Sequence, residues 1–537
     1  TEALVLTAIF AVLFASRKRP RQFRILFSAA IFGCLCLCVY AVSDLAEQID
    51  LAEYLAVPEE SEGDFIAEHY TDSAAVELDF PLQQRNLVYI FLESMEITYA
   101  DTSVGGAFDE SVIPELTRIA LANQCFNGDS AQLNGGISYS GTRWTMGAMF
   151  AQTSGLPLKV TGITNESASR YDSFLVGLVG LGDILADQGY RQVLVLGSDA
   201  VFGGRKGYFT THGPYEIRDY GYALENGLIP EGHRVFWGYE DFYLFDIAKQ
   251  TLGELAADGQ PFNLTLLTVD THFEDGYVCE LCGDGFGDDQ YANVIACSDR
   301  QVAEFVAWLQ QQDFYDNTTI IICGDHPTMD TDFCQDVPED YLRRVYTAII
   351  NPAAEPEDPE AVRAYSTMDM FPTTLAAMGV GIEGERLGLG TNLFSDVPTL
   401  TEELGDEAIR PAIARRTSFL TDTFVLGNSE DYLDQASEHA YVEMFVYPSG
   451  AGFVLRGLQD LNLDAVERVD AVLTDTRTGE SVERQVLSTR YNVDGEKFSY
   501  ELRTGYAAED LPYLQVEFLI TVTGVERYPI AQWTYAE

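Results

Sequence analysis

The chain has 537 residues and a formal net charge of −52, because 84 aspartates and glutamates oppose 32 lysines and arginines. With 47% hydrophobic and 12% aromatic residues, the composition excludes a disordered acidic chain. A protein this acidic is repelled by phosphate backbones, which excludes nucleic acid as a partner. At roughly 100–200 residues per domain, the length allows two or three domains.

The first 43 residues are apolar except for one basic cluster. Residues 25–43 carry no charge over 19 positions, close to the ~20 residues that cross a ~30 Å hydrocarbon core. Residues 3–16 are equally apolar but shorter. We predict two transmembrane helices in residues 1–43, the first truncated, rather than a signal peptide. The basic residues between them are Arg17, Lys18, Arg19, Arg21 and Arg24.

The basic cluster also predicts the orientation. Loops rich in Lys and Arg stay in the cytoplasm, so the chain after residue 44 is expected outside the cell membrane. Residues 1–43 carry a net charge of +4, whereas residues 44–537 carry −56. The acidity therefore belongs to the part that we expect to be extracytoplasmic.

Residues 44–83 are polar and acidic and are interpreted as a juxtamembrane linker. Between residues 84 and 400, short apolar runs alternate with amphipathic stretches such as 176–189 and 293–312. Uninterrupted apolar runs are typical of strands buried on both faces of a parallel sheet. We therefore predict an α/β domain with a mostly parallel sheet. The strand-like runs are residues 86–93, 192–197, 263–269, 319–324 and 345–350.

The pattern changes after residue 400. Residues 401–437 are interpreted as a connector. Residues 438–537 contain alternating segments separated by turn signals such as SGAG, RTGE and VDGE. This spacing predicts a small β-sandwich-like C-terminal domain.

Polar residues follow three of the predicted strands. Glu93 ends the first run, His272 follows the third, and Asp325 and His326 end the fourth. Reactive groups in open α/β sheets lie beyond the carboxyl ends of the strands. Each residue alone is equally a hydrogen-bonded strand end or a helix cap, but a carboxylate after an apolar strand needs a cation. Together they predict a site for a divalent ion.

A nucleophile and a phosphate-binding cation are also predicted. Thr142 lies in a glycine-flanked loop before an apolar helix, where backbone N–H groups favour anions. It is a candidate nucleophile if a metal ion activates it, and otherwise a helix cap. Arg205 and Lys206 lie in a glycine-rich loop after the second strand and are candidates for binding phosphate.

Six motifs, in this order, resemble the lipoteichoic acid synthase and glucan phosphoglycerol transferase family of the alkaline phosphatase/sulfatase superfamily. They are IFLESME, GTRWTMGAMFAQTSGLPL, FGGRKGYFTTHG, TVDTHF, CGDHP and RLGLGTNLFS. The resemblance covers about residues 85–395 and the membrane segment, and implies an alkaline-phosphatase-like sandwich.

The resemblance implies that Glu93, Thr142, Asp325 and His326 bind one divalent ion, most often manganese, with magnesium or zinc as alternatives. It implies that Thr142 attacks phosphatidylglycerol and forms a phospho-threonine intermediate. An envelope glycan or polyglycerol phosphate then accepts the group. Arg205 or Lys206, together with His272, would contact the substrate.

Other interpretations share parts of this evidence. The same chemistry serves a phosphoethanolamine transferase or a sulfatase-like phosphodiesterase. Sulfatase activity is disfavoured, because Thr142 is not in the C/S-x-P-x-R motif whose Cys or Ser becomes formylglycine. A glycan-binding surface protein with an inactive scaffold is the interpretation without enzyme activity.

The nine cysteines fall into two groups. Three lie in the second predicted membrane helix, and six lie in the predicted α/β domain. In an extracytoplasmic compartment we expect disulfides rather than a zinc site at Cys279-x-x-Cys282. The pairings that we predict are Cys279 or Cys282 with Cys297, and Cys323 with Cys334.

Overall fold

The computed structural model describes residues 64–424 except 129 and 161–173, and residues 437–535 except seven short gaps at 438, 448–449, 459–465, 487, 492–496, 508 and 523–524. The predicted transmembrane helices and residues 44–63 of the linker lie outside the described residues. Within the described part, no helix combines the length and apolar character that crossing a membrane requires.

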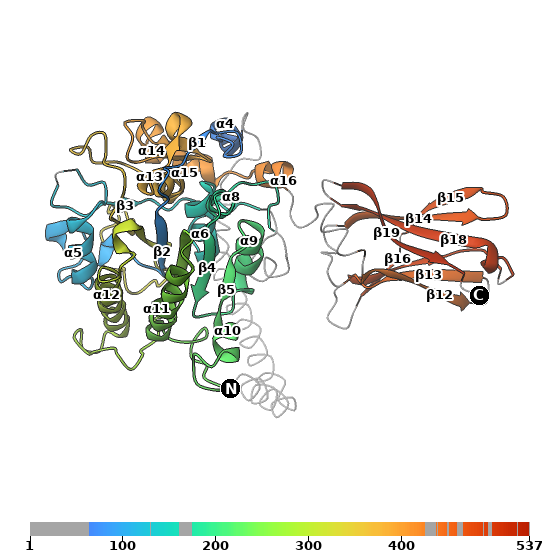
Figure 1. Ribbon diagram of the computed structural model, residues 1–537, viewed down its shortest axis with the longest axis horizontal. Coiled ribbons are helices and arrows are strands. Elements are labelled where there is room, and N and C mark those ends of the chain that lie inside the picture. Colours follow the sequence, from blue (N-terminus) through green and yellow to red (C-terminus); the bar gives the residue numbers. More distant parts are fainter. Residues whose placement is uncertain are drawn as a thin grey trace, which may run out of the picture. The chain divides into compact units, whose positions relative to one another are not determined.

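A seven-stranded sheet forms the centre of the α/β part (Figure 1). Its strand order is β3-β8-β7-β2-β6-β4-β5. Five neighbouring strands, from β7 to β5, run parallel to one another. At one edge of the sheet, β8 pairs antiparallel with β7, and β3 pairs antiparallel with β8. The mostly parallel sheet is thus confirmed. The strands are β2 (Asn86–Leu92), β3 (Gly135–Gly136), β4 (Arg191–Leu196), β5 (Glu216–Arg218), β6 (Phe262–Leu267), β7 (Thr318–Gly324) and β8 (Val345–Ile350).

Helices cover both faces of this sheet, and the alternation of side chains along each strand divides the core into two clusters. In β2, Leu87, Tyr89 and Phe91 pack on one face, whereas Val88 and Ile90 pack on the other. The first face is covered by α6 (Thr145–Ser154), α8 (Leu181–Asp187), α9 (Arg205–Thr211) and α13 (Met370–Ala377). The second is covered by α5 (Pro114–Ala122), α10 (Tyr220–Glu225), α11 (Asp241–Asp258) and α12 (Gln290–Leu309).

The predicted strands of the central sheet are all present, within two residues at each end. The helix predicted over 293–312 is present as α12, but the one predicted over 176–189 is restricted to α8. Gly177 has a left-handed φ of 98° and Gly180 is extended, so the chain becomes helical only at Leu181.

Short elements complete the α/β part. They are α4 (Phe65–His69), β1 (Leu78–Asp79), β9 (Gly381–Ile382), β10 (Arg386–Leu387), β11 (Gly390–Thr391), α14 (Leu400–Leu404), α15 (Asp406–Ala414) and α16 (Phe419–Thr423).

The C-terminal strands form two four-stranded antiparallel sheets, ordered β12-β13-β17-β16 and β15-β14-β18-β19. Phe453 of one sheet and Val469 and Phe518 of the other belong to one buried cluster. The predicted β-rich C-terminal part is therefore present. Its strands are β12 (Tyr441–Tyr447), β13 (Gly450–Arg456), β14 (Val466–Asp475), β15 (Ser481–Gln485), β16 (Ser488–Tyr491), β17 (Lys497–Arg503), β18 (Leu514–Val522) and β19 (Val525–Thr534).

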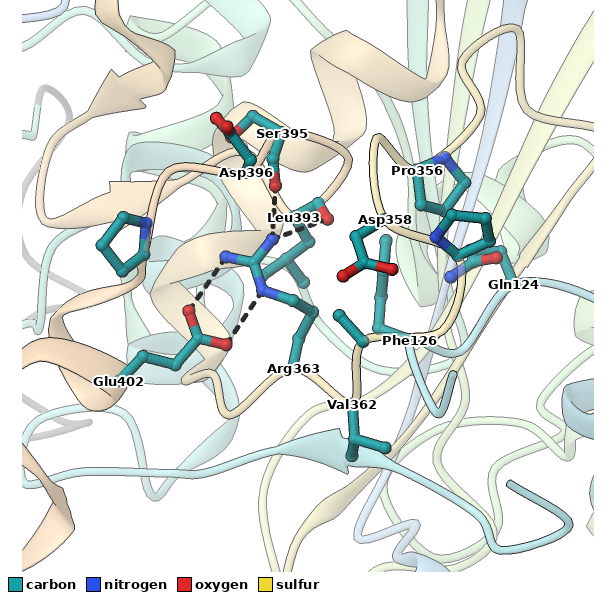
Figure 2. A pocket seen from close by; sticks show the side chains of 13 residues that line it. Gln124, Phe126, Pro356, Asp358, Val362, Arg363, Leu393, Ser395, Asp396 and Glu402 are labelled. Carbon is teal, nitrogen blue, oxygen red and sulfur yellow. Dashed lines mark hydrogen bonds and ion pairs between the residues drawn. The ribbon is translucent and has the colours of Figure 1, made fainter. Parts of the chain in front are cut away.

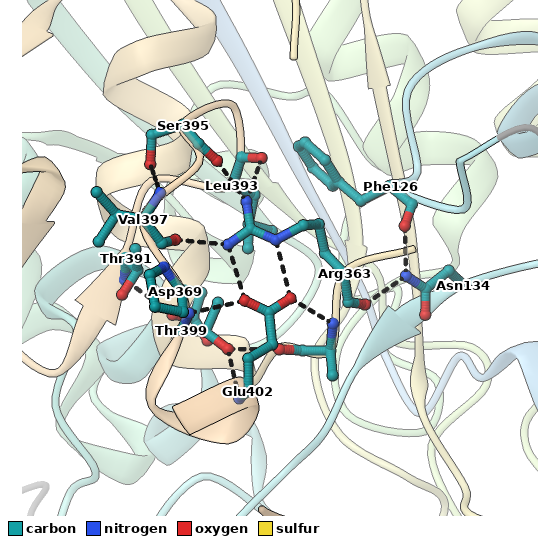
Figure 3. Close-up of polar contacts among 12 residues, drawn as sticks. Phe126, Asn134, Arg363, Asp369, Thr391, Leu393, Ser395, Val397, Thr399 and Glu402 are labelled. Carbon is teal, nitrogen blue, oxygen red and sulfur yellow. Dashed lines mark hydrogen bonds and ion pairs between the residues drawn. The ribbon is translucent and has the colours of Figure 1, made fainter. Parts of the chain in front are cut away.

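A pocket of about 230 Å³ lies beside Phe126, Asp358 and Glu402 (Figure 2). Arg363 lines it, but all five N–H donors of this guanidinium are already used. They bind both oxygens of Glu402 and three backbone carbonyl oxygens, those of Leu393, Ser395 and Val397 (Figure 3). Because the charge of Arg363 is neutralised and its donors are used, the pocket has no available cation to bind an anion.

Candidate active site

The predicted site residues follow four adjacent strands. In the order β7-β2-β6-β4, these strands lead into Asp325 and His326, Glu93, His272, and the loop before Arg205. Parallel strands end at the same edge, so residues separated by more than 200 positions meet there. This adjacency was not available from the sequence, where the same strands occur in the order β2, β4, β6, β7.

Glu93, Asp325 and His326 form a buried cluster. His326 Nε2 lies 3.5 Å from Glu93 Oε1 and 3.4 Å from Asp325 Oδ2. One ligand atom from each residue lies within 4.8 Å of the others, and all three side chains are almost fully buried. The predicted neighbours are thus brought together.

Ser94 joins the two carboxylates of this cluster. Its N–H donates to Asp325 Oδ1 at 2.8 Å and its hydroxyl donates to Glu93 Oε1 at 2.9 Å. Ser94 has a left-handed φ of 54°. Such backbone is costly for a residue with a side chain and concentrates at functional sites. The strained turn directly after β2 therefore positions both acids.

The close packing of the two strand ends requires glycine at position 324. A Cβ there would lie 1.9 Å from the carbonyl oxygen of Met95. Glycine at this position thus permits a close approach between two backbone segments. Any side chain at this position would push Asp325 away from Glu93.

The two carboxyl groups of the cluster have pKa values shifted in opposite directions. Burial raises the pKa of Glu93, but the charges of His272 and His326 and the hydrogen bond from the Ser94 hydroxyl outweigh it, so the pKa lies below its usual range. Burial and the neighbouring charge of Glu93 raise the pKa of Asp325 well above its usual range. Two carboxylates this close cannot both remain ionised without a compensating charge.

The donor atoms of the cluster fit a divalent ion. His326 Nδ1 hydrogen-bonds to the carbonyl oxygen of Pro327 at 2.9 Å, which makes Nδ1 the donor. In the neutral imidazole, the form that binds metals, the lone pair is then on Nε2, which faces the two acids. Neither His326 Nε2 nor Asp325 Oδ2 has a hydrogen-bond partner. Buried polar atoms normally have hydrogen-bond partners, so two unpartnered ligand atoms this close to Glu93 are suited to bind a cation.

Thr145 is a functional candidate that the sequence analysis missed. It is the first residue of α6, and its hydroxyl donates to Glu93 Oε2 at 3.2 Å. The preceding residue, Trp144, provides no side-chain cap for the helix. Uncapped N–H groups at a helix N-terminus favour an anion. Thr145 is half-buried and is therefore not sealed off from solvent.

Thr142, the predicted nucleophile, lies instead in a fully buried turn. Its hydroxyl donates to the carbonyl oxygen of Tyr139 at 3.1 Å and accepts hydrogen bonds from the Tyr139 N–H and from Thr367. The glycine before Thr142 indicated that the helix begins there, but α6 begins three residues later. This difference moves the helix N-terminus to Thr145.

Arg205 is buried, whereas the neighbouring Lys206 is exposed. Burial lowers the pKa of Arg205 to about 10, although the charges of Glu93, Asp199, Asp219 and Asp325 act to raise it. One nitrogen donates to the Asp199 carbonyl oxygen at 2.8 Å, while the buried Nε has no partner. Arg205 thus has a donor available for an anion, which favours it over Lys206.

His272 lies within an exposed aromatic surface formed by Phe202, Phe236 and Trp237, which are 37–40% exposed. The Trp237 ring lies 5.0 Å from His272 and 5.5 Å from Phe202. His272 Nδ1 hydrogen-bonds to the Phe273 carbonyl oxygen at 2.7 Å, and its charge acts on Glu93. Exposed apolar surface of this kind marks interaction sites.

The predicted disulfides are absent, because all six cysteines among the described residues are free thiols. The Cys323–Cys334 pairing is wrong for a simple reason. Cys323 packs into the core on one face of the sheet, and Cys334 packs against the core on the other.

Comparisons with known proteins identify a family and several relatives. The sulfatase family matches residues 85–380. Phosphoglycerol transferase I of Xanthomonas axonopodis pv. citri (strain 306) is 35% identical over 325 residues, which are 59% of this chain and 44% of the relative. The protein of the same name from Escherichia coli O6:K15:H31 is 30% identical over 325 residues, 59% of this chain and 40% of the relative. The chain spans less than half the length of these relatives.

Two solved structures are also similar. The lipoteichoic acid synthase LtaP from Listeria monocytogenes has a TM-score of 0.44 and 17% identity, over 65% of this chain and 81% of that one. The Streptococcus pyogenes phosphoglycerol transferase GacH, in complex with sn-glycerol-1-phosphate, has a TM-score of 0.41 and 13% identity, over 68% of this chain and 90% of that one.

Proposed function

The chain belongs to the sulfatase family, and we propose that it moves glycerol phosphate from phosphatidylglycerol to a hydroxyl group of an envelope glycan or of polyglycerol phosphate. The relatives named phosphoglycerol transferase I support the choice of the transferred group. The observation that carries the proposal is the hydrogen bond from Thr145 to Glu93, at the edge of a buried cluster of unpartnered donor atoms. This arrangement places a hydroxyl beside groups that can bind a cation.

We propose Thr145 as the nucleophile in place of Thr142. Its hydroxyl lies at an uncapped helix N-terminus, beside the charge of Glu93, while that of Thr142 is fully used in its turn. A threonine nucleophile also argues against sulfatase activity, because enzymes that hydrolyse sulfate esters use a formylglycine made from Cys or Ser. The sequence around Thr145, WTMGAM, contains no C/S-x-P-x-R motif.

Glu93, Asp325 and His326, together with the Thr145 oxygen, would hold one divalent ion, for which we propose manganese, with magnesium and zinc as alternatives. Such an ion, when bound, lowers the pKa of a coordinated hydroxyl and offsets charge on phosphoryl oxygens. Ser94 keeps the two carboxylates in place. His326 presents its lone pair because Pro327 holds the opposite nitrogen.

The reaction proceeds in two steps. In the first, the Thr145 hydroxyl loses its proton and its oxygen forms a bond to phosphorus, while the diacylglycerol oxygen leaves and takes up a proton. The product on the enzyme is glycerophosphoryl-threonine. In the second, a hydroxyl of the acceptor loses its proton and attacks phosphorus, and it displaces the Thr145 oxygen, which regains a proton. Arg205 binds the phosphoryl oxygens, and His272 carries the proton between the leaving and attacking oxygens.

The remaining partners follow from the surroundings of the site. The aromatic surface beside His272 is proposed to hold the acceptor glycan, because its exposed rings lie next to the group that handles the acceptor proton. We propose that residues 1–43 anchor the chain in the cell membrane, with the catalytic domain extracytoplasmic and close to its lipid donor. The sequence of that segment supports this anchoring.

The test uses the full chain in detergent micelles that contain phosphatidylglycerol labelled in its glycerol headgroup, with manganese. Diacylglycerol release, and label retained on the denatured protein, are measured for the wild type, Thr145→Ala and Thr142→Val. We expect both signals to be lost in Thr145→Ala and retained in Thr142→Val, which preserves the shape of a buried side chain. Loss in Thr142→Val alone, with that variant folded, contradicts Thr145. Labelled glycerol phosphate released only into water, even with acceptor present, indicates a hydrolase.

A further inference from the structure

A cluster of three cysteines lies outside the site described above. Cys279 and Cys282 belong to the connection between β6 and α12, and Cys297 lies in α12. Cys279 Sγ lies 3.7 Å from Cys282 Sγ and 3.8 Å from Cys297 Sγ. All three sulfur atoms are within 4.8 Å of one another.

We propose that Cys279, Cys282 and Cys297 bind a zinc ion that fastens the β6–α12 connection to α12. The spacing of the sulfur atoms favours a metal over a disulfide. In a tetrahedral site with Zn–S bonds of about 2.3 Å, neighbouring sulfur atoms are about 3.8 Å apart. A disulfide bond is about 2.05 Å long and joins two sulfur atoms only, so it would leave the third thiol unused.

The surroundings of the sulfur atoms suit a thiolate site. Cys279 and Cys297 are buried, while Cys282 is half-buried, so water can reach the fourth coordination position. Gln301 Nε2 donates to Cys297 Sγ at 3.3 Å, and the Arg300 guanidinium donates to it at 3.5 Å. Three thiolates and one zinc ion carry a net charge of −1, which Arg300 offsets. Donors of this kind orient ligands and tune a metal site.

A zinc ion bound by the three cysteines would stabilise the connection between β6 and α12. The connection runs from Thr268 to Asp289 without a helix or strand and carries His272 near its start. Connections longer than about 12–15 residues without secondary structure are uncommon in compact domains. A metal that joins Cys279 and Cys282 to α12 divides this connection into two shorter segments, one on each side of the bound cysteines. It thereby restricts the movement of His272 relative to the sheet.

Cobalt substitution tests the proposal without measuring activity, so its failure is distinct from failure of the proposed function. The full chain is purified under reducing conditions, freed of metal and titrated with Co²⁺. Cobalt bound to thiolates gives a charge-transfer band in the near ultraviolet, which the oxygen and nitrogen ligands of Glu93, Asp325 and His326 cannot produce. We expect the band in the wild type, and we expect added Zn²⁺ to abolish it.

Matched variants assign the band to the cluster. Cys297→Ser and the half-buried Cys282→Ser are expected to lose it, and protein purified without added metal should contain one zinc fewer per chain. Cys125→Ser changes a buried cysteine outside the cluster and should retain both signals. The absence of the band in the reduced wild type would overturn the proposal. So would peptide mapping that finds a disulfide among the three cysteines in zinc-free protein purified without reductant.

Discussion

The hydroxyl of Thr145 donates a hydrogen bond to Glu93 across 3.2 Å, although 52 positions separate the two residues in the chain. Thr145 begins α6 and Glu93 directly follows β2, so the contact joins a helix N-terminus to a strand C-terminus. This relationship places the candidate nucleophile beside the buried cluster of Glu93, Asp325 and His326.

Replacing Arg205 with Ala should reduce kcat/KM for the lipid donor by about 10²–10³-fold, as expected for one lost donor to a charged transition state. Arg205→Lys should recover part of this loss, because a lysine retains the charge but not the forked geometry. Diacylglycerol release at several donor concentrations measures the effect. Lys206→Ala serves as the control, and an equal loss in that variant would show that the exposed lysine binds the phosphate.

Manganese should raise the melting temperature of the metal-free protein, because an ion that binds only the folded chain stabilises it by ~2.7 kcal/mol at 100 times its Kd. Manganese prefers oxygen and imidazole ligands over thiolates, so this shift reports on the Glu93 cluster. Asp325→Asn removes one charged ligand and should reduce the shift in a thermal melt with increasing Mn²⁺. A shift of the same size in that variant would place the ion elsewhere.

Trp237→Ala should raise KM for the glycan acceptor several-fold and leave the release of diacylglycerol without acceptor unchanged. The reason is that the Trp237 ring lies 5.0 Å from the His272 ring on the exposed aromatic surface and is not part of the buried cluster of Glu93, Asp325 and His326. Steady-state kinetics with the acceptor varied at fixed donor, and then the reverse, separate the two effects. If KM rises for phosphatidylglycerol instead, the surface binds the lipid.

The buried carboxyl of Asp369 predicts a stability that falls with rising pH. Asp369 accepts hydrogen bonds from the N–H and the hydroxyl of Ser366. It also accepts one from the Thr391 N–H (Figure 3). Burial raises the pKa of Asp369 to about 6, although these hydrogen bonds and Arg363 act to lower it. A group with a raised pKa in the folded state stabilises the fold below its unfolded pKa of ~3.9, and that contribution is lost as the pH rises through about 6.

Two pKa units correspond to ~3 kcal/mol. The measurement is the free energy of unfolding in urea from pH 4 to pH 7.5, for the wild type and for Asp369→Asn, which cannot ionise. The stability of the wild type relative to the variant should fall by roughly 2.4 kcal/mol over this range, because part of the contribution is already lost at pH 4. A constant difference between the two proteins would show that Asp369 is ionised throughout.

The sequence predicted those features that depend on local pattern. Glu93 and Asp325 were found because a carboxylate directly after an apolar strand is conspicuous. Thr145 was not singled out because Gly141 indicated that the helix begins at Thr142, and the start of α6 three residues later has no side-chain cap to signal it. The choice between Arg205 and Lys206 depended on which side chain turns inward, which is set by the packing of α9. The Cys323–Cys334 pairing was wrong because the face on which a strand residue lies is decided by register in the sheet.

The strand order has a consequence for how the protein acquires its site during synthesis. Asn86 in β2 contacts Thr318 in β7, 232 positions later. A nascent chain that has already produced Glu93, Thr145, Arg205 and His272 still lacks the strand that belongs beside β2. Contacts of such sequence separation form slowly, because a long loop must close before they are made. Fragments that end before residue 318 are thus expected to expose an unpaired β2 edge and to depend on chaperones until β7 inserts.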